Sequence, residues 1–69
     1  MNPVEQDILR RKNEILSEVN GIFKLNMKIT DWDVPEADDA LAGKIIIDIM
    51  QEALDKLKEK LDAGEFKNY

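Results

Sequence analysis

An apolar repeat in the C-terminal half of the chain constrains the fold more than any other feature. The repeat has a strict heptad spacing, in which apolar residues recur at alternating steps of three and four, as in a helix that packs along one partner helix. Its members are Ile47, Met50, Leu54, Leu57 and Leu61. Five further apolar residues widen the apolar arc in the first half of the same helix to about 200°. These are Ala42, Ile45, Ile46, Ile49 and Ala53.

A helix with such a wide apolar arc needs two neighbours, and a chain of 69 residues offers only one other long helix. Either the middle of the chain folds over the second face, or a second copy of the chain covers it. We favour the second copy and expect a predominantly α-helical homodimeric bundle, with residues 1–69 forming one small domain. The residues expected in its core or dimer interface are Ile45, Ile46, Ile49, Met50, Leu54 and Leu57.

Capping signals set the bounds of two long helices, expected at about 3–20 and 35–63. Asn2 is a good N-cap, Pro3 suits the first helical position, and Glu5 follows as in a capping box. The stretch Asp33-Val34-Pro35-Glu36 repeats this signal for the second helix. Gly64 is the expected terminator, with Phe66 placed to fold back onto the last turn.

The segment between these helices allows two interpretations. Residues 23–30, FKLNMKIT, alternate apolar and polar side chains, which is typical of a strand, and Asn20-Gly21 just before them favours a break. The alternative fold is therefore α-β-α, with a strand at 22–30 that pairs with its copy across a dimer axis. If Gly21 terminates the first helix at positive φ, Gly21→Ala should destabilise the protein. A continuous helix would instead give a plain helical hairpin.

Composition limits how so short a chain is stabilised. A domain of this size buries only about 60% of the surface of its unfolded form, so small folds depend on disulfides, metals or oligomerisation. The chain has no Cys and no His, which leaves oligomerisation. The absence of Cys, of a signal-peptide pattern in MNPVEQDILRRK and of a long apolar segment leads us to expect a cytoplasmic protein without a membrane segment.

The inventory of reactive side chains argues against catalysis. Without His or Cys, and with Ser17 and Thr30 as the only aliphatic hydroxyls, no usual nucleophile–base pair can be assembled. The acidic stretch TDWDVPEADD offers carboxylates that could bind a cation. Counted from Asp31 as a calcium-binding loop, it has Glu36 where the loop needs Gly and Ala42 where the loop needs Glu. Helix capping explains most of its acids. We expect no enzyme activity, no cofactor and no metal.

Two functions remain. The first is a non-catalytic protein-interaction module or regulator that acts as a homodimer and binds an unidentified protein partner through Trp32, Val34 and Phe66. The second is a nucleic-acid-binding regulator that uses the basic run Arg10-Arg11-Lys12. A formal net charge of −5 and the lack of interleaved aromatic residues make nucleic acid the weaker alternative.

Overall fold

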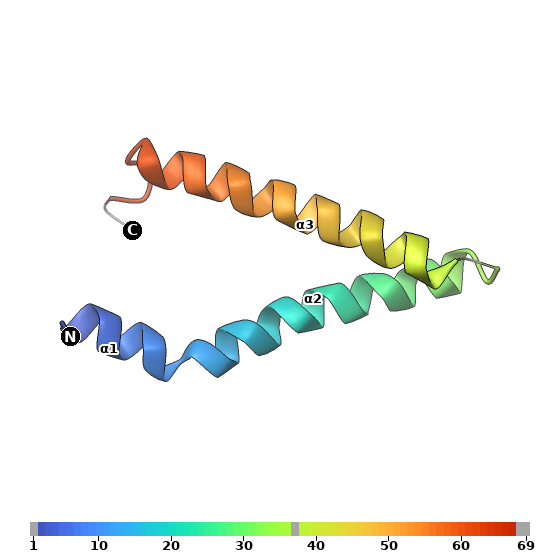
Figure 1. Ribbon diagram of the computed structural model, residues 1–69, viewed down its shortest axis with the longest axis horizontal. Helices are drawn as coiled ribbons and strands as arrows, with labels where there is room; N and C mark the ends of the chain where they lie inside the picture. Colours follow the sequence, from blue (N-terminus) through green and yellow to red (C-terminus); the bar gives the residue numbers. More distant parts are fainter. Residues whose placement is uncertain (1, 37, 68–69) are drawn as a thin grey trace.

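The chain folds into an open helical hairpin. The structure, a computed structural model, describes residues 2–36 and 38–67. Helices α1 (Pro3–Arg10) and α2 (Lys12–Asp33) form one arm, and α3 (Asp39–Asp62) runs back as the other arm. Figure 1 shows the two arms meeting near the turn and diverging toward the chain ends. The helical fold class is thus confirmed, and the described residues contain no strand.

The first arm begins where its capping signal predicts. The Oδ1 of Asn2 accepts a hydrogen bond from the backbone N–H of Glu5 at 2.8 Å, and its Nδ2 donates to Glu5 Oε1 at 3.0 Å. The arm breaks at one residue, because Arg11 (φ −96°, ψ 10°) leaves helical geometry between α1 and α2. The predicted helix 3–20 is therefore two helices that continue to Asp33.

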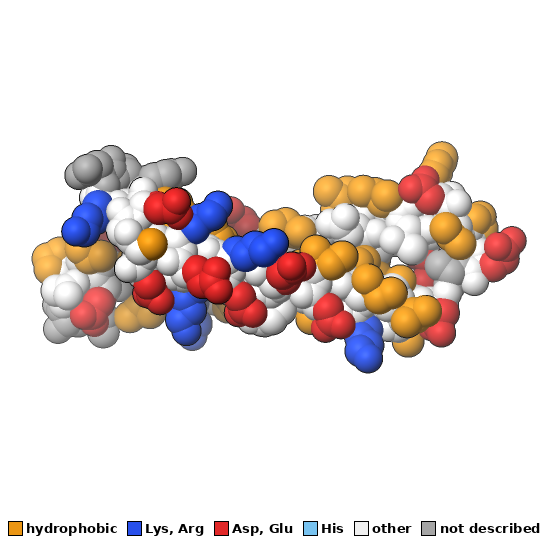
Figure 2. Space-filling model, turned by 90° about the horizontal axis from the view of Figure 1, so that it is seen from above, with side chains coloured by type: hydrophobic (Ala, Val, Ile, Leu, Met, Phe, Trp, Pro, Cys, Tyr) orange, Lys and Arg blue, Asp and Glu red, His pale blue; other side chains and the backbone are white. Residues whose placement is uncertain are grey.

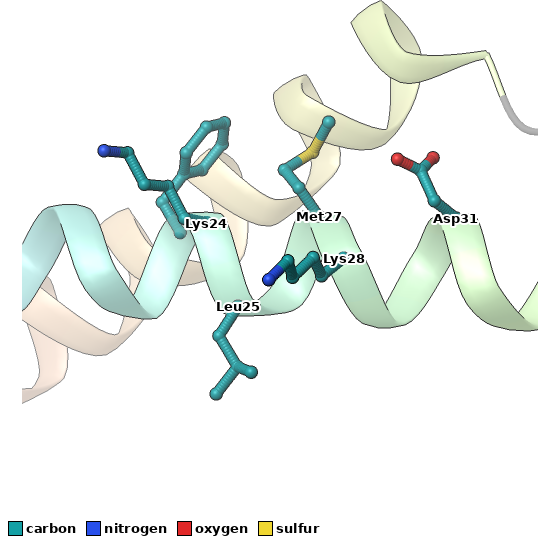
Figure 3. A pocket seen from close by; sticks show the side chains of 6 residues that line it. Lys24, Leu25, Met27, Lys28 and Asp31 are labelled. Carbon is teal, nitrogen blue, oxygen red and sulfur yellow. The ribbon is translucent and has the colours of Figure 1, made fainter.

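Residues 22–30 are helical, which corrects the expectation of an extended strand. They lie within α2, and among the described glycines only Gly64 has a positive φ, so Gly21 does not terminate a helix. The alternation of apolar and polar side chains in residues 23–30 arises because α2 has apolar residues on two sides. Met27 points toward α3 while Leu25 points away from it (Figure 3). A helix with two apolar sides reproduces, over eight residues, the pattern that predicted a strand.

The second arm begins later than predicted and ends where predicted. Asp38, not Asp33, caps α3, and its Oδ1 accepts from the N–H groups of Ala40 at 3.0 Å and Leu41 at 3.2 Å. A turn at Pro35 and Glu36 lies between the arms. At the C-terminal end, Gly64 has φ 80°, and the N–H of Glu65 bonds to the carbonyl of Lys60 at 3.1 Å. This is a Schellman motif, as the sequence predicted.

The single chain has almost no core. Among residues 2–36 and 38–67 only Gly43 is buried. A Cβ at this position would lie 3.6 Å from Phe23 Cζ and 3.9 Å from Met27 Sδ, so α2 and α3 are in contact there. The radius of gyration is 16.0 Å, whereas a compact domain of this length has about 11 Å. The hairpin therefore leaves unburied the surfaces that a globular domain packs together.

Candidate interaction surface

The diverging arms enclose an apolar groove. We call it the arm groove; it is lined by Val19, Ile22, Met50, Ala53, Leu54 and Leu57. The first two residues come from α2 and the other four from α3, on the side of Gly43 that leads toward the chain ends. Leu54 and Leu57 are about half exposed there, although both belong to the heptad repeat. The arm groove is therefore an apolar surface that the chain itself does not fill.

A second apolar surface lies near the turn. Along α2 four residues are spaced by three, four and three positions, which is the spacing of a seam for another helix. They are Ile22, Leu25, Ile29 and Trp32, and their exposed fractions are 53%, 58%, 47% and 87%. Figure 2 shows hydrophobic side chains gathered over the turn end of the hairpin, whereas acidic and basic side chains cover the middle of α3. Sequence reasoning missed this seam because the strand interpretation hid its helical spacing.

The six residues expected in the core or dimer interface are not buried within one chain. Ile46 and Met50 are half-buried, on the side of α3 that approaches α2. The other four, Ile45, Ile49, Leu54 and Leu57, are 49–59% exposed. The predicted core is therefore not formed within the single chain.

The three residues expected to bind a partner lie in different environments. Trp32 is 87% exposed on the last turn of α2, beside Ile29 and Lys28 in a shallow hollow. Val34 is half exposed directly after α2. Phe66 is half-buried after the Schellman turn at the far end of α3. The structure thus brings Trp32 and Val34 to one end of the hairpin and places Phe66 near the other.

The basic run is partly neutralised by a single acid. Asp7 pairs with Arg10 at 3.1 Å and with Arg11 at 3.3 Å, one partner for each carboxylate oxygen. All three side chains are about half exposed or more, so these pairs add little to stability. They do lower the positive charge that the run presents to a phosphate backbone.

Two acids of the TDWDVPEADD stretch face each other across the turn. Asp31 on α2 points toward α3 (Figure 3). A side-chain hydrogen bond with Asp39, helped by repulsion from that like charge, raises the pKa of the Asp31 carboxyl above its ordinary value. Protonation of the Asp31 carboxyl removes the repulsion between the two side chains. Among the described residues, no group of three or more acids is arranged to hold a metal ion.

Comparisons with known proteins add no further constraint. No protein-family model matches the chain, and neither a curated protein nor a solved structure is significantly similar to it. Of the three described helices, none combines the length and the apolar character needed to cross a membrane.

Proposed function

We propose that the protein is a small non-catalytic interaction module that functions as a homodimer, with the apolar surfaces of the hairpin buried against a second copy. The observation that carries this proposal is the exposed area. The chain exposes 6,373 Å², whereas a folded monomer of 7.9 kDa exposes about 4,400 Å². The difference, about 2,000 Å² per chain, is surface that folded proteins of this size keep out of water.

The size of this excess fits a permanent dimer. Covering it on two chains removes about 4,000 Å² in total, within the range of about 2,000–5,000 Å² for obligate homodimers. The arm groove, together with Ile22, Leu25 and Ile29 of the seam on α2, supplies apolar residues for such an interface. Obligate interfaces are more hydrophobic than transient ones. The lack of Cys and His supports a non-catalytic role.

An additional protein partner would bind residues that the dimer leaves exposed. Trp32 is the strongest candidate because Trp is enriched at binding hot spots and this side chain is 87% exposed. No observation favours nucleic acid as the ligand, since Asp7 pairs with two of the three basic residues proposed to bind it.

Sedimentation equilibrium tests the proposal directly. We expect a dimer at low micromolar concentration, with helix content measured by circular dichroism falling on dilution. Leu54→Asp, in the arm groove, should shift the protein to monomer, whereas Lys58→Asp, on the polar side of α3, should leave it dimeric. A folded monomer that persists unchanged at low micromolar concentration would overturn the homodimer.

A further inference from the structure

A hollow between α2 and α3 contains one polar side chain among apolar ones. It is lined by Ile22, Asn26, Ile46, Ile49, Met50 and Ala53. This hollow continues into the arm groove, with which it shares Ile22, Met50 and Ala53. Among the described residues that line either of the two, every one except Asn26 is apolar. We call the combined lining of the hollow and the arm groove the Asn26 face.

The Asn26 face lies on one flank of the hairpin. At about 100° per residue, Ile49 and Ala53 lie on one side of Met50 around α3, whereas Ile47 and Gln51 lie on the other side. Ile47 and Gln51 line a separate hollow, to which α2 contributes Asn20. The chain therefore has two asparagines on α2, about 120° apart around the helix, that belong to opposite flanks of the hairpin.

The hydrogen bonding of Asn26 is incomplete within one chain. The side chain is half-buried, and its Nδ2 donates to the backbone carbonyl of Ile22 at 2.8 Å. This bond uses one of the two N–H groups of the amide, and no hydrogen bond from a described residue reaches Oδ1. Water can bind Oδ1 in the open hairpin. Once the Asn26 face is covered, this acceptor needs a donor from whatever covers it.

The exposed area identifies a second copy as the occupant of the Asn26 face. The excess of about 2,000 Å² per chain is well above the roughly 800 Å² that each partner contributes to an interface of standard size. Covering it requires a surface about as extensive as the hairpin, and a second hairpin offers one with the same apolar lining. In a two-fold symmetric interface, each residue beside the axis meets its own copy.

We propose that Asn26 of one chain hydrogen-bonds to Asn26 of a second copy at the two-fold axis of the dimer, and that this pair fixes how the two Asn26 faces align. The proposal rests on the homodimer proposed above and adds the residue that determines its register. The remaining N–H of each amide donates to the Oδ1 of the other, so both acceptors are satisfied.

The pair fixes the register because other alignments leave a polar atom buried without a partner. A shift of one helical turn would place each Oδ1 of Asn26 against apolar side chains, and a buried acceptor without a donor is costly. A single buried Asn determines register and oligomer state in coiled coils for the same reason, at a cost in stability.

Disulfide trapping tests the contact, because the chain has no Cys of its own. Asn26→Cys brings two thiols together at the axis, and we expect most of the oxidised protein to run as a covalent dimer on a non-reducing gel. Asn20→Cys is the matched control. It places the same thiol on the opposite flank of the same helix and should give little covalent dimer.

Replacing the amide with an apolar side chain tests the role in register. Asn26→Leu should lower the dissociation constant by about tenfold, since no amide then has to be desolvated. Sedimentation should also show more than one oligomer, because the apolar faces can align in several ways. Asn20→Leu makes the same change outside the Asn26 face and should keep a single dimer with an unchanged dissociation constant.

The outcomes separate this proposal from the homodimer itself. If the unchanged protein is monomeric, both proposals are overturned. If it is dimeric and Asn26→Cys is trapped no better than Asn20→Cys, only the Asn26 pair is overturned. The same holds if Asn26→Leu forms a single dimeric species, because a residue that merely fills space in the interface would leave the oligomeric state unchanged.

Discussion

Replacing Gly21 with Ala tests whether α2 is continuous through the segment whose pattern suggested a strand. Gly21 lies in the interior of α2, and a Cβ added there would meet no atom within 4 Å. The substitution therefore costs no packing and gains helix propensity, which is about 1 kcal/mol per Gly→Ala change in a helix interior. For a domain of this size, 1 kcal/mol corresponds to an increase in Tm of about 4–8 °C.

The matched control is Gly64→Ala at the end of α3. Gly64 has φ 80° in the Schellman motif, a conformation that costs residues with a Cβ about 1 kcal/mol or more. The two variants carry the same chemical change and should shift stability in opposite directions. Urea denaturation followed by circular dichroism, with all proteins at one concentration, measures both. A loss of stability in Gly21→Ala would refute the continuous helix and support a break at this residue.

Two further substitutions test the interface and the turn. In the proposed dimer Ile49, which is 59% exposed in the single chain, is buried against the second copy, so Ile49→Ala should destabilise the dimer by about 2–5 kcal/mol. Ile47→Ala, on the other flank of α3, should cost less, and equal losses in thermal denaturation would contradict the burial of Ile49 in the interface. The raised pKa of Asp31 means that the protonated carboxyl stabilises the folded protein at acid pH and that this stabilisation is lost as pH rises through the pKa. Asp31→Asn keeps an uncharged side chain at this position and should therefore raise Tm at neutral pH. The difference in Tm between Asp31→Asn and the unchanged protein should therefore vanish as pH falls below 3.8, the ordinary pKa of Asp, and a difference that is independent of pH would contradict the raised pKa of Asp31.

Local signals in the sequence predicted the ends of the hairpin well. The caps at Asn2 and Gly64 depend on residues within one turn of the chain, so their geometry follows from the sequence itself. The start of α3 was misplaced because Asp33 and Asp38 are both good caps. Only the later one leaves enough chain, from Val34 to Asp38, to reverse direction between the arms.

The middle of α2 and the interaction surface were harder to predict. Asn20-Gly21 is a plausible terminator, and nothing local indicates that α3 packs against Phe23 and Met27 and that α2 runs on to Asp33. The exposure of Trp32 depends on where α2 ends and on the direction in which the chain turns, which are tertiary properties. The wide apolar arc of the second helix predicts a second neighbour. In the open hairpin Ile45 and Ile49 remain about half exposed, and the dimer stays a prediction.

Because the arms are in contact at Gly43, near the turn, a small rotation between them produces a large displacement at the chain ends. Helix α3 extends beyond Gly43 for about 28 Å at 1.5 Å per residue. A rotation of about 10° at this fulcrum would move the far end of α3 by about 5 Å, roughly half the distance between two packed helices. The volume of one side chain at position 43 would thus set the opening at the other end of the molecule, far from any residue it touches.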